Sequence, residues 1–295
     1  MKPIIAVTGP TASGKTALAV SIARQTNGEI ISADSRQVYR RMDIGTGKDL
    51  AEYGEIPYHL IDICEPGTRY NLHRFLSDFH KAYKDIIARG RQPILCGGTG
   101  LYLESALSGI RLPEVPANPL LRRQLESLTL NELTEILKSF KTLHNSTDVD
   151  SVQRAVRAIE IEQYYKDNPE VSRQTSRHNV NPLPHQLYLI DISRDLRRQR
   201  ITDRLTSRLQ EGMIEEIKNL LAEGILPEDL IYYGLEYKYV TLFIIGKMSY
   251  SEMKQRLEIE IHKFAKRQMT WFRGMERRGF SFLKIPFEKL NDFTI

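Results

Sequence analysis

The feature that most constrains this chain is a glycine-bounded loop near its start, set between an apolar run at residues 4–7 and a helix-like stretch at residues 17–24. It reads Gly9, Pro10, Thr11, Ala12, Ser13, Gly14, Lys15, Thr16 and matches the pattern G-x-x-x-x-G-K-[ST] in its required strand-to-helix context. Such a loop points successive backbone N–H groups at phosphate oxygens, and the following helix N-terminus favours negative charge. Lys15 is placed to reach the terminal phosphates, and the Thr16 hydroxyl to bind Mg²⁺. The sequence therefore predicts a site for a di- or triphosphate.

The strands that follow restrict the kinds of reaction in which this phosphate could take part. Residues 93–96, the best central strand, run into Gly97-Gly98-Thr99-Gly100 and offer none of the carboxylates that nucleotide hydrolases place there. Residues 30–32 instead lead into Ala33 and Asp34, which puts one acid at the carboxyl edge of the sheet, where α/β proteins bind ligands. Two interpretations of Asp34 are open: a capping residue or Mg²⁺ ligand, or a general base for a nucleophile other than water.

The order of the elements predicts the fold class. Alternating strands and helices over the first 112 residues indicate a parallel α/β sheet flanked by helices, of the P-loop NTPase-like kind. Residues 113–185 begin with three prolines and then show helical periodicity, including a capping box that opens at Thr129. A strand at residues 187–192 follows. We therefore expect a catalytic core formed by residues 1–112 and 186–295, with an all-helical insertion at residues 113–185.

Composition and charge restrict the cellular location and the binding partners of the protein. Two cysteines, Cys64 and Cys96, do not make a disulfide framework, and no stretch has the length of a membrane span, so we expect a cytoplasmic protein without a membrane partner. The net charge is only +5, but basic residues crowd two helices of the C-terminal third. A solvated helix face is the simpler interpretation of each, and binding of a polyanion such as nucleic acid is the alternative that two such helices favour.

Several blocks together resemble one family. They are the loop at residues 9–16, residues 31–39, residues 42–46 with Lys48, residues 59–62, residues 97–102, residues 150–157 and residues 265–273. In this order they are similar to the tRNA dimethylallyltransferase (tRNA isopentenyltransferase) family, bacterial type, and they cover nearly the whole chain.

The resemblance implies transfer of a dimethylallyl group from dimethylallyl diphosphate to N6 of the adenosine immediately 3′ of the anticodon in tRNA. Lys15, Asp34 and Thr99 are then the expected catalytic residues, with Asp34 accepting the N6 proton and Thr99 hydrogen-bonding the diphosphate or the reacting centre. Mg²⁺ on Thr16 is the expected cofactor, and the chain is expected to act as a monomer. The resemblance also predicts contacts with the tRNA anticodon stem-loop from Asp34, Ser35, Arg36, Gln37, Thr99, Arg122, Gln153, Arg154, Ala155, Val156 and Arg157.

The sequence also departs from the family pattern. Leu235-Glu236-Tyr237-Lys238 stands where the family has Gly-Tyr-Lys, and Ile261-His262-Lys263 stands where it has Thr-Arg-Gln. An arginine at the second place can help to bind the diphosphate, so His262 or Lys263 is expected to substitute for it.

Three rival functions remain. A small-molecule P-loop kinase would share the first 30 residues but has no need for the helical insertion. An adenylate isopentenyltransferase would share the chemistry but accept free AMP, and residues 153–157 of the insertion argue against it. A non-catalytic RNA-binding module would have no use for Lys15 and Asp34.

Overall fold

The computed structural model describes residues 3–110, 112–143, 147–171 and 181–295. The chain forms two compact units: residues 1–109 with 182–295 make the larger one, and residues 110–181 the smaller one. The sequence-based boundaries were residues 113 and 185. The main chain of Leu183 donates a hydrogen bond to the carbonyl oxygen of Leu107 at 3.0 Å, so the larger unit closes where the smaller one leaves and returns.

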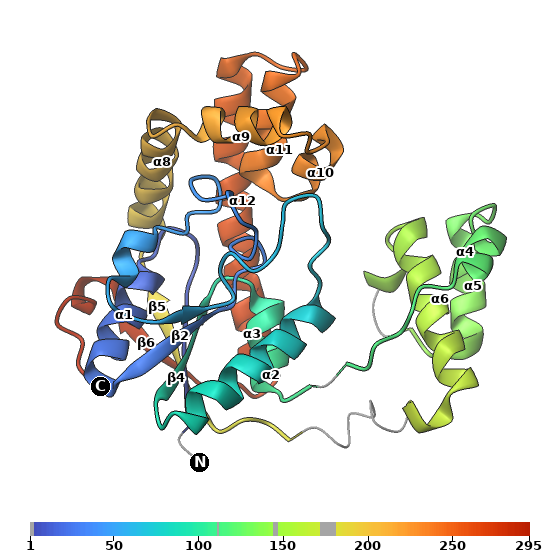
Figure 1. The fold of residues 1–295 in the computed structure, drawn as a ribbon, viewed down its shortest axis with the longest axis horizontal. Helices are drawn as coiled ribbons and strands as arrows, with labels where there is room; N and C mark the ends of the chain where they lie inside the picture. Colours follow the sequence, from blue (N-terminus) through green and yellow to red (C-terminus); the bar gives the residue numbers. More distant parts are fainter. Residues whose placement is uncertain (1–2, 111, 144–146, 172–180) are drawn as a thin grey trace. The chain divides into compact units, whose positions relative to one another are not determined.

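A six-stranded parallel sheet organises the larger unit (Figure 1), with strand order β3-β2-β4-β1-β5-β6. The strands are β1 Ile4–Thr8, β2 Gly28–Ser32, β3 Tyr58–His59, β4 Gln92–Gly97, β5 His185–Asp191 and β6 Phe282–Pro286. The predicted parallel sheet flanked by helices is confirmed. Strand β3 ends at His59, because Leu60 and Asp62 adopt positive φ angles of 63° and 55°.

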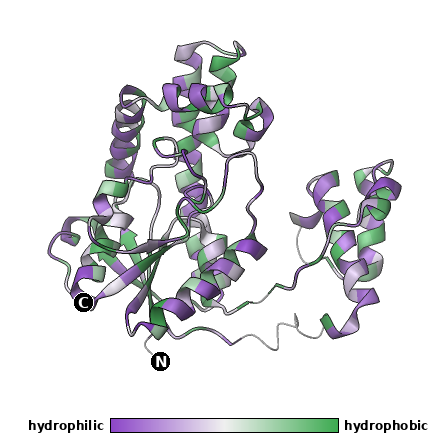
Figure 2. Ribbon diagram, in the orientation of Figure 1, coloured by the Kyte–Doolittle hydropathy of each residue, from purple (hydrophilic) through white to green (hydrophobic). Residues whose placement is uncertain are grey.

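Residues of the central strands are buried on both faces, as a parallel sheet covered by helices requires. Ile5 and Val7 of β1 and Ile94 and Cys96 of β4 share one apolar cluster with α1 (Lys15–Thr26). The residues between them point to the opposite face, because side chains alternate along a strand. Figure 2 shows the apolar sheet between more polar helices.

The other helices of the larger unit follow the predicted order. They are α2 Leu72–Ala88, α3 Gly100–Leu107, α8 Arg194–Gln210, α9 Met213–Ala222, α10 Pro227–Tyr232, α11 Leu235–Ile244 and α12 Tyr250–Arg277, with short 3₁₀ turns η1 Leu50–Tyr53 and η4 Phe287–Lys289. Helix α2 is capped by Asn71, whose side chain accepts a hydrogen bond from the main chain of Arg74 at 3.0 Å.

The smaller unit is helical in its described residues. It contains α4 Pro119–Leu125, α5 Leu130–Phe140, the 3₁₀ turn η2 Thr147–Val149 and α6 Val152–Asp167. The capping box at the start of α5 is confirmed, with Thr129 and Glu132 bonding each other's main chain. Leu133 and Leu137 of α5 pack against Ala155 and Ile159 of α6 to form its core.

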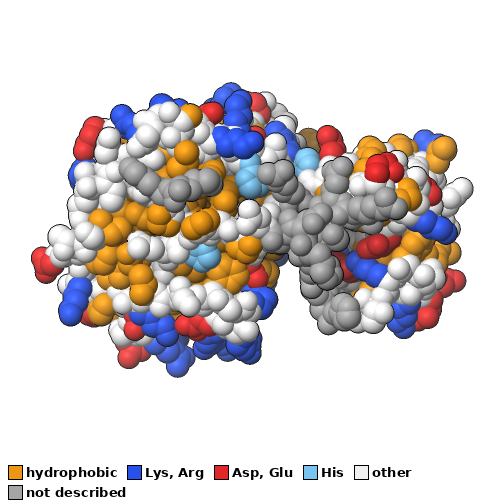
Figure 3. All heavy atoms as spheres, turned by 90° about the horizontal axis from the view of Figure 1, so that it is seen from below, with side chains coloured by type: hydrophobic (Ala, Val, Ile, Leu, Met, Phe, Trp, Pro, Cys, Tyr) orange, Lys and Arg blue, Asp and Glu red, His pale blue; other side chains and the backbone are white. Residues whose placement is uncertain are grey.

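No described helix is both long and apolar enough to span a membrane. The larger unit seen from below (Figure 3) shows apolar side chains among polar ones, with Lys and Arg toward its margin. Apolar atoms make up much of any folded surface, so this face by itself does not indicate a site.

Candidate active site at the carboxyl edge of the sheet

The predicted phosphate-binding loop connects β1 to α1 with the backbone that such a loop needs. Gly14 precedes the helix with φ 82°, and Ala12 also has a positive φ, 62°. Gly9 packs so closely on Ser13 that a Cβ there would lie 2.7 Å from Ser13 Oγ. Ser13 Oγ is buried and has no hydrogen-bond partner among the described residues. A loop of this shape, with an orphaned hydroxyl inside it, is suited to an anion.

The side chain of Lys15 folds back onto the start of this loop. Its Nζ donates a hydrogen bond to the carbonyl oxygen of Pro10 at 2.8 Å. Burial, assisted by the neighbouring charge of Arg204, lowers the pKa of Lys15 to about 8, although Cys96 and Asp34 act in the opposite direction. The ammonium group is therefore poorly compensated, and an anion in the loop would stabilise its charged form.

Asp34 and Thr99 meet at the ends of the neighbouring strands β2 and β4. Thr99 Oγ1 accepts a hydrogen bond from the main chain of Ser35 at 3.1 Å, and the Thr99 main chain donates to the Ala33 carbonyl at 3.3 Å. A Cβ on Gly97 would lie 2.3 Å from that carbonyl oxygen, so only glycine permits this approach. The electrostatic effect of Asp34 on Lys15 links this pair to the phosphate loop. The structure thus brings together the three residues predicted to be catalytic.

Asp34 also has a structural partner. Its Oδ1 accepts a hydrogen bond from the main chain of Arg36 at 2.8 Å, which forms a tight Asx-type turn. This contact uses one carboxylate oxygen, so the capping role considered for Asp34 and a role as base are compatible.

The side chains of Arg36 and Gln37 differ in how many partners they already have within the protein. The Gln37 side chain accepts from Ser32 Oγ at 2.9 Å and donates to the Gly47 carbonyl at 3.1 Å, so it holds the loop in place. The Arg36 guanidinium lies 5.5 Å from the centre of the Tyr232 ring and is partly exposed.

Some motif residues stabilise loops instead of facing the site. Lys48 is buried and donates hydrogen bonds to the Tyr39 carbonyl at 2.6 Å and to Asp43 at 2.5 Å, and it also pairs with Asp62. Glu216 accepts main-chain hydrogen bonds from residues 43–45 and one from the Tyr237 hydroxyl at 2.6 Å. Tyr237, the tyrosine of the divergent 235–238 block, thus anchors the loop that follows β2.

Two side chains from distant helices complete the phosphate loop, and sequence reasoning did not single them out for it. Gln268 of α12 accepts a hydrogen bond from the main chain of Thr11 at 2.8 Å and donates to the Gly98 carbonyl at 2.9 Å. Arg200 of α8 donates to the Ala12 carbonyl at 2.8 Å. The available signal was the four-residue spacing of Arg200, Arg204 and Arg208, which places three guanidinium groups along one face of a helix.

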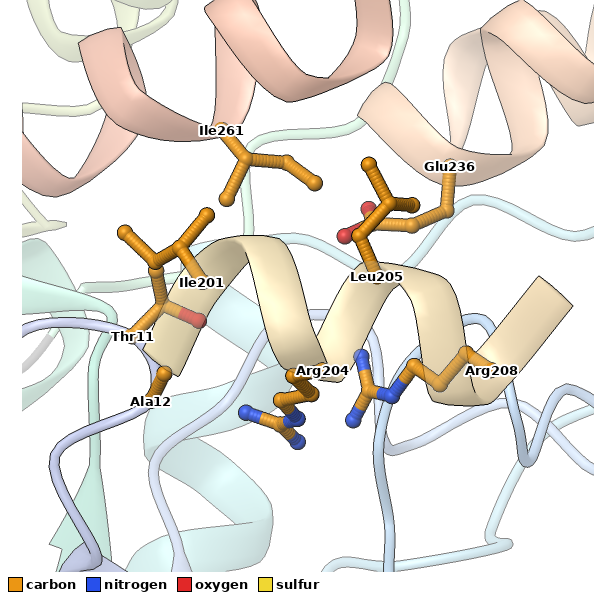
Figure 4. A pocket seen from close by; sticks show the side chains of 8 residues that line it. All are labelled: Thr11, Ala12, Ile201, Arg204, Leu205, Arg208, Glu236 and Ile261. Carbon is orange, nitrogen blue, oxygen red and sulfur yellow. The ribbon is translucent and has the colours of Figure 1, made fainter. Parts of the chain in front are cut away.

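Next to the loop lies a cavity that α8 borders (Figure 4). It is lined by Thr11, Ala12, Ile201, Arg204, Leu205, Arg208, Glu236 and Ile261. Burial lowers the pKa of Arg208 to about 10, and the neighbouring charge of Arg204 acts in the same direction. Burial raises the pKa of Glu236. The cavity therefore holds two guanidinium groups and a carboxyl group that are only partly compensated.

The RNA contacts predicted for the smaller unit fall into two groups. Gln153 and Arg154 are exposed at the start of α6, where Arg154 pairs with Asp150. Ala155 and Val156 are 0% and 8% exposed, so their side chains form part of the apolar core instead of a contact surface.

Arg122 and Arg157 both bind the buried Glu160. Arg122 does so through two hydrogen bonds of 2.9 and 2.8 Å, and Arg157 through an ion pair and a further bond to the Val115 carbonyl at 3.0 Å. Burial opposes ionisation of Glu160, but these arginines and the Asn118 main chain lower its pKa to about 2.

The residues available for a metal are few. Thr16 lies in the first turn of α1 and its side chain is hydrogen-bonded to the Tyr53 hydroxyl. The described residues contain no group of three or more His, Cys, Asp or Glu side chains arranged to hold a metal ion. A single hydroxyl beside a phosphate cradle fits Mg²⁺ that is bound mainly by phosphate oxygens and water.

The parallel sheet and its loop define the class: this is an α/β protein of the P-loop NTPase-like fold. The IPP transferase family model matches residues 37–275, and an isopentenyl transferase model matches residues 2–55. The chain belongs to the IPP transferase family.

Named relatives and solved structures agree with this assignment. The chain is 58% identical to "tRNA dimethylallyltransferase 1" of Parabacteroides distasonis over 94% of its length and 90% of the relative. It is 58% identical to "tRNA dimethylallyltransferase 2" of Bacteroides fragilis over 99% of its length and 96% of the relative. The solved tRNA delta(2)-isopentenylpyrophosphate transferase of Staphylococcus epidermidis is 33% identical, with a TM-score of 0.69 and coverage of 99% and 97%. A eukaryotic dimethylallyltransferase solved acting on tRNA is 25% identical, with a TM-score of 0.79 and coverage of 96% and 74%.

Proposed function

We propose that this chain is a tRNA dimethylallyltransferase. It transfers a dimethylallyl group from dimethylallyl diphosphate to N6 of the adenosine 3′-adjacent to the anticodon and releases diphosphate. The observation that carries the proposal is the junction of the loop at residues 9–16 with Asp34 and Thr99, in a member of the IPP transferase family. This junction pairs an anion cradle that follows β1 with an acid that follows β2, and Thr99 lies at the end of β4 between them.

The proposed chemistry forms one bond and breaks one. The N6 nitrogen of adenine attacks the allylic carbon, the carbon–oxygen bond to the diphosphate breaks, and the proton lost from N6 goes to Asp34. Main-chain N–H groups of the loop and Lys15 bind the charge that develops on the leaving diphosphate. Thr99 hydrogen-bonds the diphosphate or the reacting centre. Mg²⁺, bound by Thr16 and the phosphate oxygens, would neutralise further charge on the leaving group.

The acceptor must reach this junction from a stacked anticodon loop. Extruding one adenine costs about a few kcal/mol, which contacts to the rest of the RNA can offset. Asp34, Ser35, Arg36 and Gln37 are proposed contacts at the active site, and Gln153 and Arg154 are proposed contacts on the smaller unit. We also propose that the enzyme works in the cytoplasm and as a monomer.

One experiment tests the proposal against its rivals. The purified protein is incubated with Mg²⁺, dimethylallyl diphosphate and unmodified tRNA, and the digested nucleosides are analysed by mass spectrometry. We expect N6-dimethylallyladenosine, and no product from a tRNA with guanosine 3′ of the anticodon. Prenylation of free AMP in preference to tRNA would instead identify an adenylate isopentenyltransferase. Phosphoryl transfer from ATP to a small molecule, without prenylation, would identify a kinase.

A further inference from the structure

Gln268 is a buried polar side chain whose amide connects two loops of the candidate active site. The residue is only 7% exposed and lies in α12, far along the chain from both loops. Its Oε1 accepts a hydrogen bond from the Thr11 main chain at 2.8 Å, and its Nε2 donates to the Gly98 carbonyl at 2.9 Å. Thr11 belongs to the phosphate loop after β1, and Gly98 to the turn between β4 and α3 that carries Thr99. One amide therefore joins the phosphate loop to the turn at Thr99.

Helix α12 contacts the glycines on both sides of Thr99. A Cβ on Gly98 would lie 2.5 Å from Gln268 Nε2. A Cβ on Gly100 would lie 2.2 Å from Cδ1 of Trp271, which follows Gln268 by about one helical turn. Residues three apart lie on the same face of a helix, so one face of α12 fixes the turn before and after Thr99.

Thr99 in turn contacts the residues that flank Asp34. Its Oγ1 accepts a hydrogen bond from the Ser35 main chain at 3.1 Å, and its own main chain donates to the Ala33 carbonyl at 3.3 Å. Together with the two bonds of Gln268, these contacts form a continuous series from the phosphate loop to the neighbours of Asp34. The place of Asp34 relative to the phosphate loop therefore depends on the Gln268 amide.

The two α12 residues expected to help bind the diphosphate have partners on their own helix. The side chain of Lys263 is 60% exposed and pairs with Glu260. His262 lies 3.8 Å from Glu258. Among the described residues of α12, Gln268 is the one with a recorded hydrogen bond to the phosphate loop.

We infer that Gln268 is a positioning residue, which holds Thr99 and thereby Asp34 where the acceptor amine meets the bound donor. The inference rests on the proposed function for the identity of both substrates. A displacement of reacting groups by about 1 Å can slow a reaction by about 100-fold. The two hydrogen bonds of Gln268 can therefore affect the rate of transfer without adding to the affinity for either substrate.

The test compares the wild-type protein with Gln268→Met, which removes both hydrogen bonds at similar volume. At saturating dimethylallyl diphosphate and tRNA, the single-turnover rate constant should fall by about 10- to 100-fold. Affinity for pyrophosphate with Mg²⁺, measured by calorimetry, and affinity for tRNA, measured by filter binding, should stay close to wild type. A residue with only a structural role would lower the melting temperature and the fraction of active enzyme while the rate constant of that fraction stayed unchanged. This outcome would overturn the inference.

A double-mutant cycle shows whether Gln268 acts through Thr99. Thr99→Val removes the hydroxyl group at similar volume, and adding Gln268→Met to it should slow the reaction much less than Gln268→Met does alone. Independent effects of the two substitutions on the rate constant would contradict the inference. The matched control is Gln255→Met, the same replacement at an exposed position of α12, which should leave the rate constant and both affinities unchanged.

Amide hydrogen exchange tests the same inference without prenyl transfer. The Ser35 amide, which donates to Thr99 Oγ1, should exchange faster in Gln268→Met than in the wild-type protein. The Arg74 amide, which donates to the Asn71 side chain, is the reference and should not change. Unchanged exchange at Ser35 would overturn the inference. Absence of prenyl transfer in the wild-type protein would instead overturn the proposed function, and Gln268-dependent exchange at Ser35 would still stand.

Discussion

At the scale of single residues, the candidate site places charged groups where they lack full compensation. Lys15 donates a hydrogen bond to the Pro10 carbonyl, and Ser13 Oγ has no partner among the described residues. Such groups make the donor-free site less stable than a fully paired one, and they gain partners when a polyphosphate binds.

The lowered pKa of Lys15 makes donor binding depend on pH. Since the diphosphate favours charged Lys15, affinity for a non-hydrolysable prenyl diphosphate analogue should fall as pH rises through about 8, by up to about tenfold per pH unit. Donor-free stability should respond in the opposite sense: between about 8 and 10.5 the unfolded chain binds more protons at this lysine, so the Lys15 contribution to the free energy of unfolding rises with pH. Calorimetric titrations from pH 7 to 9.5 measure the affinity. Lys15→Met should bind weakly with no such fall, and a flat wild-type profile would contradict the prediction.

Asp34→Asn separates the two roles of the carboxylate. Asparagine keeps the Oδ1 acceptor for the Arg36 main chain, so the turn after β2 survives, but it cannot accept the N6 proton. The single-turnover rate should fall by about 10²–10⁴ while donor and tRNA affinities change little. Asp34→Ala is the comparison, because it removes both functions and should also lower the melting temperature. Near-wild-type turnover in Asp34→Asn would leave Asp34 with the turn alone.

At the scale of elements, helix α6 carries two kinds of arginine only three residues apart. Arg154 is exposed and pairs with Asp150, which is also exposed, whereas Arg157 binds Glu160, which is almost fully buried. Exposed ion pairs contribute little to stability, but a buried carboxylate that loses a partner is costly. One helix therefore offers an RNA-contact candidate and a structural residue side by side.

Arg154→Ala and Arg157→Ala should behave differently. Arg154→Ala should leave the melting temperature unchanged and reduce the slope of log tRNA affinity against log salt, by about 0.7 to 0.9 per lost phosphate contact. Arg157→Ala should lower the free energy of unfolding by about 1–3 kcal/mol, because Glu160 keeps only Arg122 and the Asn118 main chain. Thermal melts and salt titrations of both variants provide the measurements. An unchanged salt slope in Arg154→Ala would remove the start of α6 from the RNA surface.

At the scale of the whole molecule, the division into two units separates the proposed donor site from part of the proposed RNA surface. Every residue of the phosphate loop, of the cavity beside α8 and of the Asp34–Thr99 junction belongs to the larger unit. The smaller unit has its own apolar core.

Replacing residues 110–181 by a short glycine-serine linker should therefore leave donor binding intact. The linker has little distance to span, because Leu107 and Leu183 are joined by a 3.0 Å main-chain hydrogen bond. We expect a cooperative thermal transition and wild-type pyrophosphate affinity, with strongly weakened tRNA binding and loss of tRNA prenylation. Calorimetry and filter binding with an anticodon stem-loop measure both. Retained tRNA affinity would show that the larger unit alone holds the RNA.

Local patterns were enough to predict much of this protein. The loop at residues 9–16, the strands beside it and the Thr129 capping box depend on neighbours within a few residues, and each is present. The predicted place of Asp34 at the carboxyl edge of the sheet agrees with the hydrogen bond between its neighbour Ser35 and Thr99, because parallel strands bring their carboxyl ends to one edge. Through its motifs, the sequence by itself determined the fold class, the family and the position of the phosphate loop.

Only the tertiary structure decided which side chains from distant segments contact or lie beside that loop. Gln268 reaches Thr11 across 257 residues, and the Arg208 guanidinium, whose buried Nη2 has no hydrogen-bond partner among the described residues, lies against Gly47 of a distant loop. Likewise, Arg157 forms a structural ion pair with Glu160 because this carboxylate, one helical turn away, is buried. The local sequence determines which hydrogen bonds a side chain can form. Its burial and charge compensation depend on packing between distant segments, and these decide whether an arginine stabilises the fold or is free to bind a partner.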